Sequence, residues 1–225
     1  MILLMMVKSG CQPLEPLHID EPENVIVRDI DGNVYHPIRI GTQIWMIENL
    51  KATKFNDGTR ISHVKNNQEW LRHNRLRAPA YAEYDNTPSN AHSYGRLYNW
   101  HVLGNVKNIC PSGWHVPSDV EWEILINYLG GVSEAGRKLK EAGITHWKSP
   151  NTGGNNISGF TALPSGKRQA SDGKFSGFGE EGLWWSKTEI TNELASAFQL
   201  YYDYSGMGVL GWNKGAGFCI RCIKD

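Results

Sequence analysis

The sequence of 225 residues lacks a long hydrophobic run, an excess of charge of either sign and the usual catalytic motifs. No stretch of 18 or more consecutive apolar residues occurs, which excludes a typical transmembrane helix. Lys and Arg together number 23, as do Asp and Glu, so the net charge is 0. This balance argues against nucleic acid as a partner, because binding to phosphates requires concentrated positive charge.

The motifs that identify common enzyme classes are also missing. There is no His-Glu-x-x-His, no Gly-x-Ser-x-Gly, no Walker loop and no dinucleotide-binding glycine pattern. None of the 8 histidines lies four residues from another on an expected helix, so the spacing predicts no metal site. We therefore expect a protein that is not an enzyme and that carries no cofactor.

Aromatic residues and glycine, in contrast, are abundant. The chain contains 9 Trp, 9 Tyr and 24 Gly, with 40% hydrophobic and 20% charged residues. The hydrophobic and charged fractions are those of a globular protein, and the length allows one large domain with its own core. The glycines and aromatic residues predict a loop-rich fold that contains β-strands and is stabilised by aromatic side chains.

The pattern along the chain predicts a small sheet, then helices, then several strands. Two β-rich runs around Asp31-Gly32 predict a hairpin. Ser118-x-x-Glu121 is a capping box that predicts a helix ending at Gly130-Gly131. Shorter helices are expected over 67–76 and 133–142, and strands over 44–47, 159–163, 182–187, 195–204, 207–212 and 218–223. This order predicts an α+β fold in a single domain over residues 25–225.

The first 24 residues have the composition of an export signal and a tether. Residues 1–7 are apolar, and Ser9-Gly10-Cys11 fits the cleavage and lipidation site of a bacterial lipoprotein. Lys8 departs from that pattern, and no basic region precedes the apolar run. Residues 12–24 are rich in Pro and Glu, which favours a tether. We expect lipid attachment at Cys11 after a signal over 1–11; the alternative is a cytoplasmic chain with an apolar first turn.

The remaining cysteines predict a disulfide bond. Cys219-x-x-Cys222 has no second pair that would complete a zinc site, and it does not lie at the start of a helix as a redox pair would. A bond between Cys110 and either Cys219 or Cys222 would join the last strand to the middle of the chain. Such a bond would indicate an oxidising compartment.

Two stretches combine aromatic rings with amides and carboxylates, the groups that stack on sugar rings and bind their hydroxyls. They are residues 145–156 and residues 201–204 taken with 212–214. Trp184 and Trp185 point to opposite faces of an expected strand, so one of them can reach a surface. The candidate ligand-binding residues are Trp147, Asn151, Asn155, Asn156, Trp185, Tyr202, Trp212 and Asn213. The alternative is that these aromatic side chains hold loops onto the core.

Several motifs also occur in a fixed order along the chain. They are Asp29-Ile-Asp-Gly-Asn-Val-Tyr35, Ile40-Gly-x-Gln-x-Trp-Met-x-Glu-Asn-Leu-Lys51, Tyr98-Asn-Trp100, Ile109-Cys-Pro-Ser-Gly-Trp-His-Val-Pro-Ser-Asp119 with Glu121-Trp122, Ser158-Gly-Phe-Thr-Ala-Leu-Pro164, Gly182-x-Trp-Trp-Ser186 and Gly217-Phe-x-x-Arg-Cys222. These motifs resemble the Fibrobacter succinogenes major paralogous domain family over residues 25–225. The resemblance implies a C-type-lectin-like fold, in which two helices flank small antiparallel sheets with long loops.

The resemblance further implies the location and the disulfide of the protein. Members of this family are exported, often lipid-anchored proteins of the cell envelope, outer membrane or cell surface of Bacteroidota-like bacteria, and some have adhesive roles. A disulfide between Cys110 and Cys222 is implied, with Cys219 as a departure. A lectin calcium site would need an acidic residue after Trp212-Asn213, where this chain has Lys214, so that calcium site is not expected, and calcium at another position stays open.

Three functions follow from these expectations. The first is a cell-surface lipoprotein with a non-catalytic domain that binds a glycan or a surface protein in adhesion. The second is a structural or tip subunit of a surface filament or envelope complex. The third, and weakest, is an enzyme, either of the formylglycine-generating type or a metal hydrolase. The formylglycine-generating type needs a reactive cysteine pair. Cys219 and Cys222 are three residues apart on one expected strand, so their side chains would point to opposite faces and could not form that pair.

Overall fold

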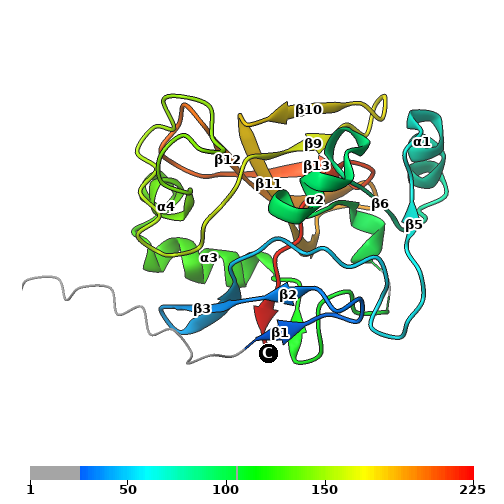
Figure 1. Ribbon diagram of the computed structural model, residues 1–225, viewed down its shortest axis with the longest axis horizontal. Helices are drawn as coiled ribbons and strands as arrows, with labels where there is room; N and C mark the ends of the chain where they lie inside the picture. The colour runs from blue at the N-terminus through cyan, green and yellow to red at the C-terminus, as the bar shows by residue number, and fades with distance from the viewer. Residues whose placement is uncertain (1–25, 105) are drawn as a thin grey trace, which may run out of the picture.

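The computed structural model describes residues 26–104 and 106–225 (Figure 1). The expected signal over 1–11, with Cys11, and the expected tether over 12–24 lie outside the described residues. Within the described part, 4 α-helices and 15 short strands form the predicted α+β fold, where the resemblance implied two helices. No helix in this part is long and apolar enough to cross a membrane.

A hairpin opens the described chain, as predicted. The carboxylate of Asp29 accepts hydrogen bonds from the backbone N–H groups of Asp31 (3.0 Å) and Asn33 (2.9 Å), and so fixes the turn. Next to it lies a four-stranded sheet in the order β3-β4-β15-β8. The strands of these two units are β1 (Val27–Arg28), β2 (Val34–Tyr35), β3 (Pro37–Ile40), β4 (Gln43–Met46), β8 (Trp114–His115) and β15 (Ile223–Lys224). Because β15 lies between β4 and β8, the last strand of the chain pairs with a strand from the first part of the described residues.

A nine-stranded sheet forms the larger half of the molecule. The order is β13-β12-β11-β9-β14-β7-β6-β5, and β10 pairs with β9. Its strands are β5 (Ser62–His63), β6 (Ala80–Ala82), β7 (Leu97–Asn99), β9 (Ser165–Arg168), β10 (Phe175–Phe178), β11 (Glu181–Glu189), β12 (Leu194–Tyr201), β13 (Gly208–Asn213) and β14 (Gly217–Phe218). The expected strand over 218–223 is divided between the two sheets.

The helices flank these sheets. They are α1 (Asn67–Arg75), α2 (Pro88–Tyr94), α3 (Asp119–Tyr128) and α4 (Val132–Leu139), with short 3-10 turns at Tyr84–Asn86 and Trp100–Val102. The predicted capping box of α3 is present: the Glu121 carboxylate accepts from the N–H (2.7 Å) and the hydroxyl (2.8 Å) of Ser118. Gly130 and Gly131 follow α3 with positive φ angles, as a glycine stop requires.

Both faces of the large sheet are covered, and this changes the expectation for Trp184 and Trp185. Trp184 packs in one core with Trp122 of α3 and Phe198, whereas Trp185 packs in a second core with Phe218. Both tryptophans are fully buried. Residues 159–163, expected as a strand, form a loop instead. In that loop the Asn156 side chain accepts from the Thr161 N–H (2.8 Å), and only Ala162 makes a β-bridge, to Lys140.

Candidate binding surface

The loop over 145–157 and the turn after β12 meet at one surface. Thr152 donates its N–H to the Tyr202 carbonyl (2.7 Å), and Tyr202 donates its own to the Glu180 carbonyl (2.8 Å). The Lys148 ammonium lies 2.7 Å from a Glu180 carboxylate oxygen and 5.1 Å from the centre of the Tyr202 ring. We call this region the tyrosine surface; it consists of Lys148, Glu180, Tyr201, Tyr202, Asp203 and Tyr204.

A buried lysine holds this surface in place. The Lys140 ammonium donates to the carbonyl oxygens of Thr152 (2.9 Å), Tyr201 (3.0 Å) and Tyr204 (2.9 Å). Burial lowers the pKa of Lys140 to about 8. Three acceptors match the three donors of an ammonium, so this one group joins the loop to the turn. The chain leaves the helix at Lys140, which is why α4 ends at Leu139 rather than near Ala142.

Several ligand-binding residues were predicted within residues 145–156, and the structure separates them. Asn155 is exposed and Tyr202 is half-buried in the tyrosine surface. Asn156 is half-buried and holds Thr161 with both ends of its amide. Trp147 and Asn151 are buried, which corrects their expected exposure.

The burial of Trp147 and Asn151 has a clear physical cause. The Trp147 indole N–H donates to the Ala162 carbonyl (2.9 Å), and its ring lies 5.5 Å from the Lys140 ammonium. The Asn151 amide donates to the carbonyls of Glu141 (2.8 Å) and Gly143 (2.7 Å). Both side chains therefore support the loop from beneath.

The other predicted ligand residues lie elsewhere. Trp185 is buried, and its indole N–H donates to the Tyr98 carbonyl (2.8 Å). Trp212 is half-buried, with its ring edge-on to Phe218 at 5.3 Å. The Asn213 side chain accepts from the Gly215 N–H (2.9 Å). Trp212 and Asn213 stand at the end of β13 that pairs with the start of β12, opposite the tyrosine surface.

Lys214, which stands where a lectin calcium site would have an acidic residue, has a structural role in the core. Lys214 is buried, and its ammonium lies 2.6 Å from the Glu189 carboxylate and 4.4 Å from the centre of the Trp100 ring. The lysine thus pairs internally with an acid. Within the described residues, no group of three or more His, Cys, Asp or Glu side chains is arranged to hold a metal ion.

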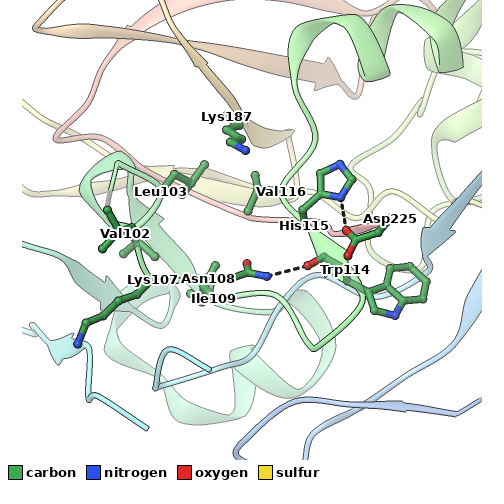
Figure 2. Close-up of a pocket in the computed structure, with 11 residues that line it drawn as sticks. Val102, Leu103, Lys107, Asn108, Ile109, Trp114, His115, Val116, Lys187 and Asp225 are labelled. Atoms are coloured by element: carbon green, nitrogen blue, oxygen red, sulfur yellow. Dashed lines mark hydrogen bonds and ion pairs between the residues drawn. The ribbon is translucent and has the colours of Figure 1, made fainter. Parts of the chain in front are cut away.

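A cavity of about 330 Å³ lies beside β8 (Figure 2). Its apolar lining comes from Val102, Leu103, Ile109 and Val116, and its polar lining includes Asn108, His115 and Lys187. Figure 2 shows the Asn108 amide directed at the Trp114 carbonyl, at a distance of 2.8 Å. No sequence pattern points to this cavity, because its lining comes from four separate segments.

His115, at the edge of this cavity, lies between two carboxylates. Its Nδ1 is 2.6 Å from Asp225 and its Nε2 is 2.6 Å from Glu121. Partial burial lowers the pKa of His115, but the hydrogen bonds to Asp225 and Glu121 outweigh burial and raise it above 6.5. The imidazolium therefore ties the last residue of the chain to the first turn of α3.

Replacing Asp225 with Asn is expected to lower the pKa of His115, as measured by NMR titration of its ring protons. The folded pKa exceeds the unfolded value of 6.5, so the stabilisation is complete below that pH and is lost as pH rises through the folded pKa. The difference in unfolding free energy between the native protein and Asp225→Asn should thus shrink as the pH rises above about 6.5. Asp203→Asn is the control, and an unchanged His115 pKa in Asp225→Asn would contradict the assignment.

The predicted Cys110–Cys222 disulfide is present, with Cα atoms 6.0 Å apart. Cys219 is the free cysteine of the described chain and is fully buried. Burial raises the pKa of its thiol to about 11. Cys219 therefore has neither a partner in Cys222 nor the low pKa that a reactive cysteine requires.

The chain was also compared with known proteins. No curated protein and no solved structure matches it. The model of the Fibrobacter succinogenes major domain matches residues 38–224, which include both sheets' central strands, α1 to α4 and both disulfide cysteines. This match covers most of the chain, and it agrees with the resemblance of the ordered motifs. The chain therefore belongs to the Fibrobacter succinogenes major domain family.

Proposed function

We propose that the protein is a non-catalytic binding module, exported to the cell envelope and held at the outer membrane or cell surface by a lipid on Cys11. It recognises a glycan, or a protein at that surface, through the tyrosine surface. The domain has the C-type-lectin-like arrangement, which the pairing of β15 with β4 supports because it brings the two ends of the domain together.

The disulfide supports export. A bond between Cys110 and Cys222 forms and persists in the periplasm or outside the cell, and is rare in the cytosol. The composition of residues 1–24 points to the same destination, since a lipoprotein signal followed by a tether would place the domain off a membrane surface.

The exposed tyrosines carry the proposal for binding. Tyr204 is 53% and Tyr201 is 38% exposed, and the backbone carbonyl of each accepts a hydrogen bond from Lys140. Lys148, Glu180 and Asp203 place charged hydrogen-bonding groups beside the rings. A sugar needs this combination, because its C–H face is apolar and its hydroxyls are polar. A preformed surface also loses little conformational entropy on binding.

The surroundings of His115 and Cys219, two side chains that could act in catalysis, favour binding over catalysis at these two positions. Both ring nitrogens of His115 are occupied by carboxylates, so the ring has no free position for a substrate proton. The Cys219 thiol is buried and stays protonated. Neither group matches the accessible nucleophile or base that an enzyme would need.

A structural role in a filament or envelope complex is the second candidate, and β13 is the observation that favours it. This strand forms one edge of the nine-stranded sheet, and Val209 (46%) and Leu210 (49%) are exposed on it. An uncharged apolar edge can add a strand from another chain. Crosslinking on intact cells that recovers a stable complex through β13 would support this role.

Binding of the purified protein to a glycan array tests the proposed function. We expect Tyr204→Ala to weaken binding to the recognised glycan about tenfold or more, because an aromatic side chain at the centre of a site carries much of the affinity. Tyr128→Ala is the matched control, since Tyr128 is 41% exposed on α3, outside the tyrosine surface. A blank array with folded protein would contradict glycan recognition and favour a protein partner.

A further inference from the structure

A second cavity, of about 450 Å³, opens at the other edge of the nine-stranded sheet. It lies at β5, the edge strand that pairs with β6 (Figure 1). Its lining residues are Thr53, Arg60, Ile61, Ser62, His63 and Tyr81. None of them belongs to the tyrosine surface or to the cavity beside β8.

Three side chains in this lining have donor groups without an acceptor among the described residues. They are the guanidinium of Arg60 and the hydroxyls of Ser62 and Tyr81. Tyr81 is the most informative, because only 7% of the residue is exposed, and its hydroxyl is not among the buried polar atoms and lies in the cavity lining. Burial raises the pKa of Tyr81, so the hydroxyl keeps its proton and remains a donor.

The acidic groups near this cavity are already paired. Asp31 lies 2.8 Å from the Lys54 ammonium. Glu83 lies 2.6 Å from His63 and 3.2 Å from Arg96. The exposed guanidinium of Arg60 is therefore the charge left without a counterion, and the cavity favours an anion.

A flat ring lies beside these donors. The His63 imidazole stacks on Tyr81 with 4.8 Å between ring centres and 3° between planes, and 32% of its side chain is exposed. One face of the ring is covered by Tyr81, which orients it as a platform. A sugar ring could pack its C–H face against such a platform while its acidic group meets Arg60.

We propose that the cavity at β5 binds the oxyanion of an acidic saccharide, with Arg60, Ser62 and Tyr81 as donors to the anion and His63 as a stacking surface for the sugar. The anion is a carboxylate or a sulfate, both of which present coplanar or convergent oxygens to a guanidinium. This site is separate from the tyrosine surface, and its existence does not depend on the function proposed for that surface.

Titration calorimetry of the whole chain tests the site with three probes: tetragalacturonate, a sulfated heparin tetrasaccharide and neutral maltotetraose. In about 0.15 M salt, where long-range attraction is screened, we expect one or both acidic probes to bind and the neutral probe not to bind. The preferred acidic probe tells whether the site takes a carboxylate or a sulfate. Failure of both acidic probes would overturn the proposal.

Single substitutions distinguish specific binding in this cavity from general electrostatic attraction of the acidic probe to a basic surface. Arg60→Gln is expected to weaken binding of the acidic probe about tenfold. Tyr81→Phe, which keeps the ring, is expected to weaken it by a smaller factor of about three to ten. The control is Arg75→Gln, an exposed arginine on α1 outside the cavity. Tyr204→Ala should leave this binding intact, which distinguishes it from the tyrosine surface. Equal binding to Arg60→Gln and native protein would overturn the proposal.

Discussion

Replacing Cys110 and Cys222 together with Ala is expected to lower the free energy of unfolding by about 4–5 kcal/mol. The two residues are 112 positions apart, so their bond removes much of the freedom of the unfolded chain. Both are fully buried, so each truncation also removes core contacts. A loss of this size is a large part of the stability of a typical domain. Unfolding in guanidinium chloride, followed by tryptophan fluorescence, measures it.

Two controls isolate the bond itself. Dithiothreitol should destabilise the native protein by a similar amount and leave the double alanine variant unchanged. Cys219→Ala removes the free thiol without touching the disulfide, and we expect it to cost only about 1 kcal/mol. If the double variant unfolds at the same denaturant concentration as the native protein, the bond does not stabilise the fold.

Local sequence patterns predicted the regular elements well. Ser118 and Glu121 cap α3 as expected, because a capping box needs only residues three apart. The hairpin around Asp31-Gly32 also formed, since its turn is held by the neighbouring Asp29. These features depend on interactions within a few residues, so the sequence alone contains the information for them.

Burial of the aromatic residues was harder to predict, because it depends on contacts between distant segments. Trp147 and Trp185 were expected at a surface, yet each donates its N–H to a carbonyl on another part of the chain. The tyrosine surface was predicted in part through Tyr202. Lys140, which fixes it, gave no sequence pattern, because its acceptors lie 12 to 64 residues away.

The motifs that identify the family converge on a single buried amide. The Asn49 side-chain oxygen accepts hydrogen bonds from the Trp184 indole (2.7 Å) and from two nitrogens of Arg221 (2.7 and 3.2 Å). The Asn49 amide nitrogen donates to the Tyr94 carbonyl (2.8 Å). Arg221 is fully buried, donates to the Phe160 carbonyl and lies 4.0 Å from the centre of the Phe160 ring. Four motifs far apart in sequence thus meet in the core.

Asn49→Leu is therefore expected to lower the free energy of unfolding by about 3–5 kcal/mol. Leucine has a similar volume, but it leaves the Arg221 guanidinium and the Trp184 N–H without their acceptor inside the core. The double variant Asn49→Leu/Arg221→Met removes the donor as well as the acceptor. It should lose less than the sum of the single losses, because no unpaired charge remains buried.

The coupling between Asn49 and Arg221 is measured by denaturant unfolding of four proteins: the native protein, Asn49→Leu, Arg221→Met and the double variant. A loss below about 1 kcal/mol for Asn49→Leu, or strictly additive losses, would show that the amide does not hold the guanidinium.

The expected coupling has a consequence for the family. Asn49, Phe160, Trp184 and Arg221 are buried, so the motifs built on them report the fold. The two binding sites that we propose use exposed residues outside those motifs, such as Arg60 and Tyr204, so we expect relatives that share the motifs to differ in what they bind.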